Sequence, residues 1–217
     1  MSENETNVKE ESNKEKELVK KLIEELQDLR YDLGYKMDDI ERVVNRLQAT
    51  IDTIDTYDYD DEANSDTRRE TPWYLESEHE TLLKMIEELQ GRAREINEYR
   101  KSIEQIIKYV ELVFNKLNGE LDIRDLQYVA KASIDYGYIT IKFNNVHLAS
   151  RHLTSETSIN ELMTEAVDLR NIKSIIMGTL IAMNIAIGRD MYEGKYSDIA
   201  DYVEDRLKDV LNLFQAQ

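Results

Sequence analysis

The chain of 217 residues has no cysteine, one proline and seven glycines. Without cysteine it has no disulfide, no thiolate metal ligand and no cysteine nucleophile. So few glycines leave little material for a phosphate-binding loop, and neither Gly-x-x-x-x-Gly-Lys-Ser/Thr nor Gly-x-Gly-x-x-Gly occurs. The scarcity of turn-forming residues, together with 34% charged and 41% hydrophobic residues, favours long helices over a compact β fold.

Positive charge is also scarce, because the formal net charge is −17 and the isoelectric point is about 4.6. A chain this acidic lacks the basic footprint that binds nucleic acid, and an anionic membrane would repel it. Residues 1–14 are polar, which predicts a disordered acidic tail rather than a secretory signal. We therefore predict a cytoplasmic protein that binds neither nucleic acid nor membrane.

Two long segments carry apolar residues in steps of three and four, the spacing of a heptad seam. They predict that residues 15–118 form a long antiparallel helical hairpin, resembling a coiled coil. Further apolar residues beside each seam widen it, as in a bundle. The first seam consists of Leu22, Leu26, Leu29, Leu33, Lys36, Ile40, Val43, Leu47, Thr50 and Ile54. The second consists of Leu82, Ile86, Leu89, Ala93, Ile96, Arg100, Ile103, Ile107, Val110, Phe114 and Leu117.

Residues 119–217 have shorter patterns and predict a smaller helical module. Gly119 follows Asn118 and is expected to end the long hairpin in a left-handed conformation. A short helix over 121–136, a helix from 158 to about 188 and a last helix over about 196–214 follow. Alternation within 138–148 is typical of a strand, so this segment is either a short β-hairpin or helical.

Small residues recur every four positions in the long helix of this module, at Gly178, Ala182 and Ala186. A ridge of small side chains allows another helix to approach closely. The surrounding apolar run is shorter than a membrane span needs, so we interpret it as a buried helix.

The acidic connector over 57–71 carries the candidate partner-binding residues. Its length exceeds that of an ordinary helix connection, which indicates partner contact. The candidates are Asp58, Asp60, Asp61, Glu62, Trp73 and Tyr74.

Oxygen ligands alternate through this connector like the start of an EF-hand loop. Counting from Asp58, however, Ala63 replaces the required glycine and Arg69 replaces the bidentate glutamate. Glu76 and His79 form a single Glu-x-x-His, whereas dinuclear iron bundles need two. We therefore predict no metal and no cofactor.

Two acidic clusters have the residue types that hold magnesium in nucleotide hydrolases. They are Glu24, Glu25 and Asp28 in the first helix and Glu161, Glu165 and Asp168 near the end of the chain. In having two such motifs in one helical chain, the sequence resembles the MazG-like pyrophosphohydrolases. This resemblance implies a magnesium-dependent hydrolase with the two clusters facing each other across a groove.

The sequence thus predicts an all-α protein with a long helical hairpin, a C-terminal helical module and room for one short β-hairpin. A sustained seam without a catalytic constellation favours a non-enzymatic scaffold or assembly protein that forms homo-oligomers and binds a protein partner. The first alternative is the magnesium-dependent nucleotide (pyro)phosphohydrolase. The second is an acidic adaptor or inhibitor that binds a basic protein surface.

Overall fold

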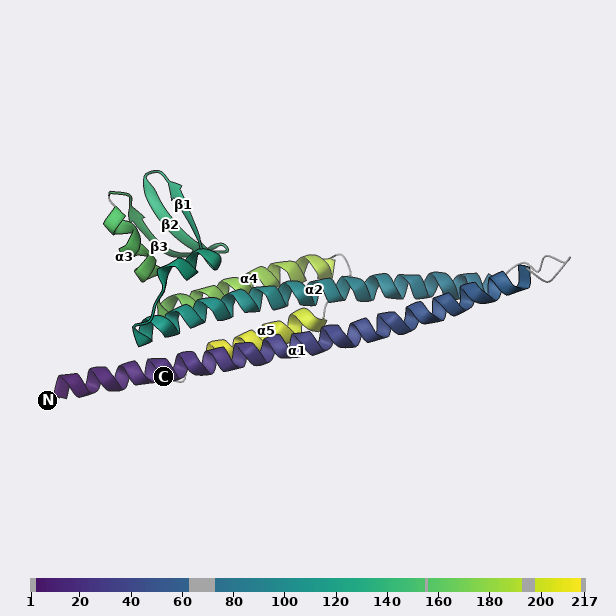
Figure 1. Ribbon diagram of the computed structural model, residues 1–217, viewed down its shortest axis with the longest axis horizontal. Coiled ribbons are helices and arrows are strands. Elements are labelled where there is room, and N and C mark those ends of the chain that lie inside the picture. The colour runs from purple at the N-terminus through teal and green to yellow at the C-terminus, as the bar shows by residue number, and fades with distance from the viewer. Residues whose placement is uncertain (1–2, 63–72, 155, 193–197, 216–217) are drawn as a thin grey trace. The chain divides into compact units, whose positions relative to one another are not determined.

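A computed structural model describes residues 3–62, 73–154, 156–192 and 198–215, with the side chains of 8–55, 76–154, 159–183 and 198–215. The described chain is mostly helical (79%) and carries a small antiparallel sheet (Figure 1). The long helices α1 and α2 pack together. In chain order the elements are α1 (Glu3–Glu62), α2 (Trp73–Asn118), the 3-10 helix η1 (Ile123–Tyr128), β1 (Lys131–Asp135), β2 (Tyr138–Phe143), β3 (Val146–His152), α3 (Glu156–Ala166), α4 (Leu169–Tyr192) and α5 (Asp198–Asn212).

The chain divides into two compact units, and each long helix contributes residues to both units. Unit 1 contains residues 1–30 and 101–217, and unit 2 contains residues 31–100. These units cut across the boundary expected at residue 118. Helix α1 begins at Glu3 rather than near residue 15, so it includes most of the segment expected to be a disordered tail.

Unit 1 is a helical bundle with a continuous apolar core. The core draws on α1, α2, α4 and α5, and α5 contributes Ala200, Val203, Leu207, Val210 and Leu211. Arg206 of α5 lies 3.6 Å from Glu25 of α1, which places these two helices side by side. The fully buried side chains include Leu22, Leu26, Leu29, Ile103, Ile106, Val110, Ile172, Ile175, Ile176 and Leu207.

The end of α2 confirms the expected stop signal. Gly119 has a φ of +78°, in the left-handed region that glycine adopts without strain. Its N–H donates to the Lys116 carbonyl at 3.0 Å, and the Glu120 N–H donates to the Asn115 carbonyl at 2.8 Å. This pair of bonds is a Schellman motif, which satisfies carbonyls that the helix leaves open.

The segment after α2 differs from the short helix expected over 121–136. It forms η1 and then strand β1, which pairs with β2. Strand β2 pairs in turn with β3, so the sheet order is β1-β2-β3 and every pairing is antiparallel. The strand interpretation of 138–148 is therefore confirmed, and the sheet has one strand more than the expected hairpin.

Two tight turns connect these strands. In the first, Tyr136 and Gly137 have φ of +48° and +78°, as a type I′ hairpin turn requires. In the second, Asn144 has a φ of +50°, which asparagine tolerates better than most residues.

The long helix expected from residue 158 to 188 is two helices. Helix α3 ends at Ala166 and α4 begins at Leu169. At Gly178, the first residue of the small-residue ridge, the close neighbour is strand β3. A Cβ atom added at Gly178 would lie 2.4 Å from Val146 Cγ2, whereas Ala182 is exposed.

The described residues of unit 2 belong to the facing parts of the two long helices. Asp55 of α1 and His79 of α2 lie 3.5 Å apart. Among the side chains described in this unit, the buried apolar ones are Leu33, Ile51, Ile86 and Ile96. Most other seam residues here are half-buried, and Val43 is 43% exposed.

Candidate functional site

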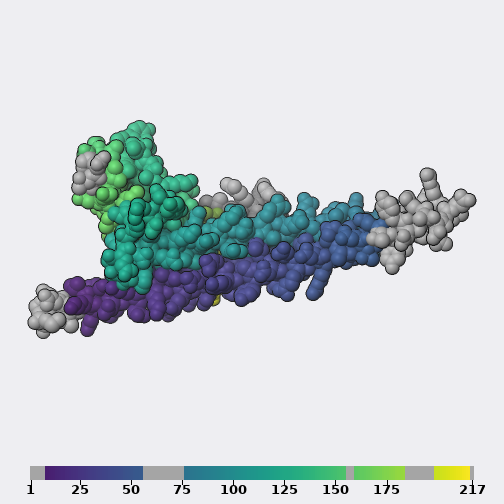
Figure 2. Space-filling view, viewed as in Figure 1, coloured from purple at the N-terminus to yellow at the C-terminus, as the bar shows by residue number. Residues whose placement is uncertain are grey.

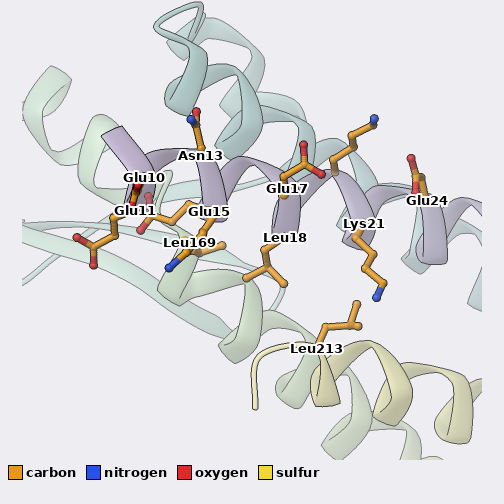
Figure 3. A pocket seen from close by; sticks show the side chains of 12 residues that line it. Glu10, Glu11, Asn13, Glu15, Glu17, Leu18, Lys21, Glu24, Leu169 and Leu213 are labelled. Carbon is orange, nitrogen blue, oxygen red and sulfur yellow. The ribbon is translucent and has the colours of Figure 1, made fainter. Parts of the chain in front are cut away.

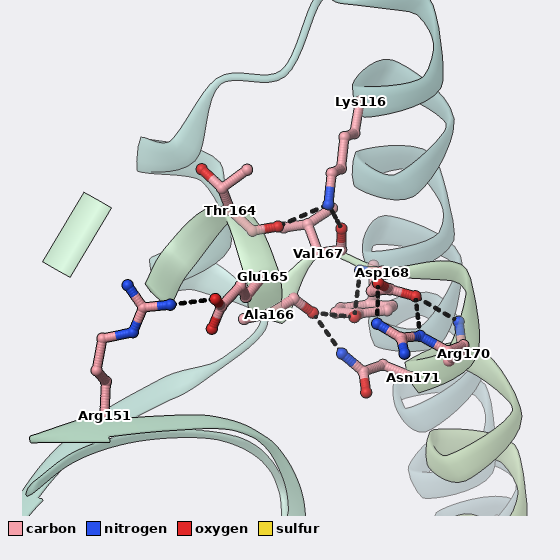
Figure 4. Close-up of polar contacts among 10 residues, drawn as sticks. Lys116, Arg151, Thr164, Glu165, Ala166, Val167, Asp168, Arg170 and Asn171 are labelled. Atoms are coloured by element: carbon pink, nitrogen blue, oxygen red, sulfur yellow. Dashed lines mark hydrogen bonds and ion pairs between the residues drawn. The ribbon is translucent and has the colours of Figure 1, made fainter. Parts of the chain in front are cut away.

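The break between α3 and α4 is held by side chains from other helices. Lys116 of α2 donates its ammonium protons to the Thr164 carbonyl at 2.8 Å and to the Val167 carbonyl at 2.6 Å (Figure 4). A cation at the C-terminus of a helix satisfies its last carbonyls and complements the negative end of its dipole. Lys116 therefore fixes the end of α3 against α2.

Tyr109 completes this junction from inside the bundle. Its hydroxyl donates to the Ala166 carbonyl and accepts the Asp168 N–H at 3.4 Å. The same carbonyl accepts a second bond of 2.9 Å from Asn171 Nδ2. Burial raises the pKa of Tyr109 to about 12, although its hydrogen bonds with Asp168 and Asn171 oppose the shift. The phenol stays neutral near pH 7, so it is a hydrogen-bond donor and not a proton-transfer group.

Asp168 precedes α4 and caps its start by a set of hydrogen bonds that occurs twice among the described residues. Its carboxylate accepts the Arg170 N–H at 2.9 Å and the Arg170 guanidinium at 2.9 and 3.1 Å. Asp122 binds Arg124 in the same way at the start of η1. The hydrogen bonds from the arginine lower the pKa of each carboxyl. Both are N-caps of the Asp-x-Arg type, a signal that sequence analysis missed.

Arg151 of β3 occupies the acidic cluster expected to hold magnesium. Its guanidinium binds Glu161 and Glu165 of α3, which joins this helix to the sheet. Figure 4 shows the pair with Glu165. Both carboxylates are already paired with a cation. Arg170 binds Asp168, so each carboxylate of this cluster contacts an arginine, whereas in the first cluster Arg206 lies 3.6 Å from Glu25. Among the described residues, no group of three or more histidine, aspartate or glutamate side chains is placed to hold a metal ion.

An open groove lies along the N-terminal part of α1, where the ends of α4 and α5 approach it (Figure 3). Its volume is about 1150 Å³. Leu18, Leu169 and Leu213 form its floor, and glutamates and lysines of α1 form its rim. Ligand pockets are predominantly apolar, so this charged trough is a solvated surface and not a small-molecule site.

The predicted partner-binding residues lie where the structure describes only the backbone. Asp58, Asp60, Asp61 and Glu62 are in the last turns of α1, and Trp73 and Tyr74 begin α2. Their side chains are outside the described residues, as is most of the acidic connector that follows Glu62, so the acidic-adaptor hypothesis stays a prediction. Glu76 is exposed, and His79 Nε2 lies 3.5 Å from Asp55 Oδ1.

The outer face of the sheet carries the two remaining histidines. His152 makes an edge-to-face contact with Tyr138, with ring centroids 5.1 Å apart. His147 lies directly opposite Lys142, which in turn lies directly opposite Lys131. Basic side chains therefore cross all three strands in one row, a feature that analysis by helical periodicity missed.

No protein-family model, curated protein or solved structure matches this chain. In the part of the chain that the structure describes, no helix combines the length and apolar character needed to cross a membrane.

Proposed function

We propose that this chain is a cytoplasmic, non-enzymatic scaffold or assembly protein whose long helices form a coiled-coil hairpin. Residues 31–100 are its binding arm, and the partner is an amphipathic helix of another protein or of a second copy. The arm recognises that helix through the part of its own seam that lacks a covering layer.

The observation that carries this proposal is a change of burial along one repeating pattern. Leu22, Leu26 and Leu29 are fully buried in unit 1, to which α4 and α5 contribute core residues. In unit 2, the seam residue Val43 is 43% exposed, and Leu83, which lies beside the second seam next to Leu82, is 45% exposed. Apolar side chains that recur at heptad spacing while exposed are the usual docking surface for another helix.

The charged residues of the arm favour selective binding of one partner over nonspecific association. Ion pairs within one helix accompany the seam, such as Arg42 with Asp39 and Lys84 with Glu80. Such exposed pairs contribute little to stability, but charges beside a seam select the partner and its register.

The test replaces these two exposed apolar residues without disturbing the core. We expect the double variant Val43→Glu and Leu83→Glu to keep its helical content, because both side chains are already half in solvent. Its self-association or partner binding should weaken at least about tenfold, since two apolar contacts are replaced by charges. Light scattering coupled to size exclusion, with circular dichroism on the same sample, measures both.

A matched control adds the same charge elsewhere on the arm. Asn45→Glu and Gln90→Glu change exposed polar residues of α1 and α2. If this control weakens association as much as the seam variant, charge and not the seam is responsible and the proposal is wrong. Magnesium-dependent turnover of nucleotides that is lost in Glu161→Gln would favour the hydrolase instead.

A further inference from the structure

The sheet of unit 1 has a free edge at β1. All five of its residues are exposed, and β1 pairs with β2 alone (Figure 1). Apart from that ladder, no hydrogen bond engages the backbone of 131–135 among the described residues. Figure 2 shows the sheet, coloured teal to green, at the surface of its unit. Such an edge is a template for a further strand.

The two faces of β1 are chemically distinct. Ala132 and Ile134 lie opposite the buried Ile141 and Ile139, so they belong to the inner face. Lys131, Ser133 and Asp135 belong to the outer face, because side chains alternate along a strand. Ile134 is nonetheless 67% exposed. The inner face of this edge is therefore apolar and uncovered.

We propose that β1 pairs antiparallel with β1 of a second copy of the chain, about a two-fold axis at Ser133. The sequence Lys131-Ala-Ser-Ile-Asp135 is self-complementary in this register. Lys131 faces Asp135 of the second copy, Ala132 faces its Ile134, and Ser133 faces its own counterpart. A two-fold interface requires this reciprocity, in which each contact occurs twice.

Charge complementarity favours β1 of a second copy, rather than a strand of different sequence, as the partner of this edge. Lys131 lies directly opposite Lys142 within its own sheet, and like charges in that position destabilise a sheet. Neither lysine has an ion-pair partner among the described residues. Asp135 of the second copy places a carboxylate beside Lys131 on the same face, and the reciprocal pair forms at the other end of the ladder.

Shape favours the same register. A pocket of about 300 Å³ lies beside the edge, lined by Ala132 and Ile141 of the sheet and by Met163 of α3. Ile134 of the second copy faces Ala132 and so covers this pocket. A shift of the register by one residue turns every side chain to the opposite face, which places Ile134 against Ser133.

The pairing extends each sheet into one continuous sheet across the two copies. A ladder of five residues is small compared with a stable protein interface, so we expect a concentration-dependent dimer rather than an obligate one. This inference goes beyond the proposed binding arm because it uses no residue of unit 2. Either idea can fail while the other stands.

Disulfide trapping tests the register directly, because the natural chain has no cysteine. Opposed Cα atoms in antiparallel strands are about 4.5–5.5 Å apart, within the range that a disulfide spans. Ser133→Cys should therefore form a covalent dimer under mild oxidation. The matched control is Ser150→Cys, which lies in the same cross-strand row on β3 and is also exposed.

We expect Ser133→Cys to cross-link at least about tenfold faster than Ser150→Cys, because only the former is held opposite its counterpart. Equal rates, or faster cross-linking through Ser150→Cys, overturn the proposal. The arm variant Val43→Glu with Leu83→Glu, combined with Ser133→Cys, should cross-link at the rate of Ser133→Cys alone. If the combined variant no longer cross-links, the two copies associate through the arm, and pairing through β1 is refuted.

Charge exchange provides a second test that does not depend on cysteine. Lys131→Asp or Asp135→Lys alone should weaken dimerisation about tenfold, since each places two like-charge pairs across the axis. The double exchange restores both pairs and should recover the natural affinity. Sedimentation at several protein concentrations measures the dissociation constant of the dimer for each variant. A double exchange no better than either single variant, or a natural chain that stays monomeric near about 1 mM, contradicts the proposal.

Discussion

Replacing Tyr109 with phenylalanine should change both the stability of the protein and its dependence on pH. Tyr109 is fully buried, and its hydroxyl donates to the Ala166 carbonyl. Phenylalanine keeps the ring and removes the hydroxyl. The carbonyl keeps the bond from Asn171 at 2.9 Å, so the substitution leaves no orphaned acceptor. We expect a loss of about 1 kcal/mol in the free energy of unfolding at neutral pH.

At high pH the order of stability should reverse, so that the phenylalanine variant has the larger free energy of unfolding. Burial raises the pKa of Tyr109 to about 12, above its ordinary value of 10.0. The folded state therefore holds the phenolic proton more tightly than the unfolded state does. This stability is fully present below pH 10 and is lost as the pH rises through 12, up to about 2.7 kcal/mol in total. Phenylalanine does not titrate, so the variant should overtake the natural protein between about pH 10 and 11.

Urea unfolding followed by circular dichroism, at several pH values between about 8 and 11, measures this crossing. The other tyrosines titrate in both proteins, so their effect cancels in the difference. Parallel pH dependences for the two proteins would falsify the assignment of a buried, proton-holding Tyr109. A loss well above 3 kcal/mol at neutral pH would show instead that the ring had moved.

Two further substitutions test the contacts of the sheet. Gly178→Ala should destabilise the protein by about 1–2 kcal/mol although alanine favours helix, because its Cβ would lie 2.4 Å from Val146 Cγ2. Adding Val146→Ala should remove most of that penalty, and a larger loss in the double variant would contradict the contact. Tyr136→Asn should stabilise the protein by about 1 kcal/mol, because tyrosine is strained at a φ of +48° and is 94% exposed there. A lower urea midpoint for this variant would mean that the ring has a packing role.

The sequence was sufficient to predict an element where the local segment makes its own backbone hydrogen bonds and shows its own hydrophobic periodicity. The Asn118-Gly119 stop predicted the end of α2, because a left-handed glycine closes a helix with nearby carbonyls. The alternation of Ile139, Ile141 and Phe143 predicted β2, and all three are buried.

Nonlocal contacts decided the elements that sequence analysis missed. Residues 121–136 have apolar spacing compatible with a helix, yet β1 forms because β2 offers it a ladder. The break after Ala166 depends on donors far away in the chain, since Tyr109 and Lys116 of α2 supply the missing hydrogen bonds. No pattern within 158–188 contains that information.

The apolar seam of the long helices separates what could be predicted from the sequence from what required the folded structure. A heptad repeat places its apolar residues on one side of a helix, so that side could be predicted for each long helix from the repeat alone. That Leu26 is buried while Val43 is 43% exposed follows from the fold. Burial depends on which elements pack over a surface, and periodicity within one helix specifies a surface but not its covering.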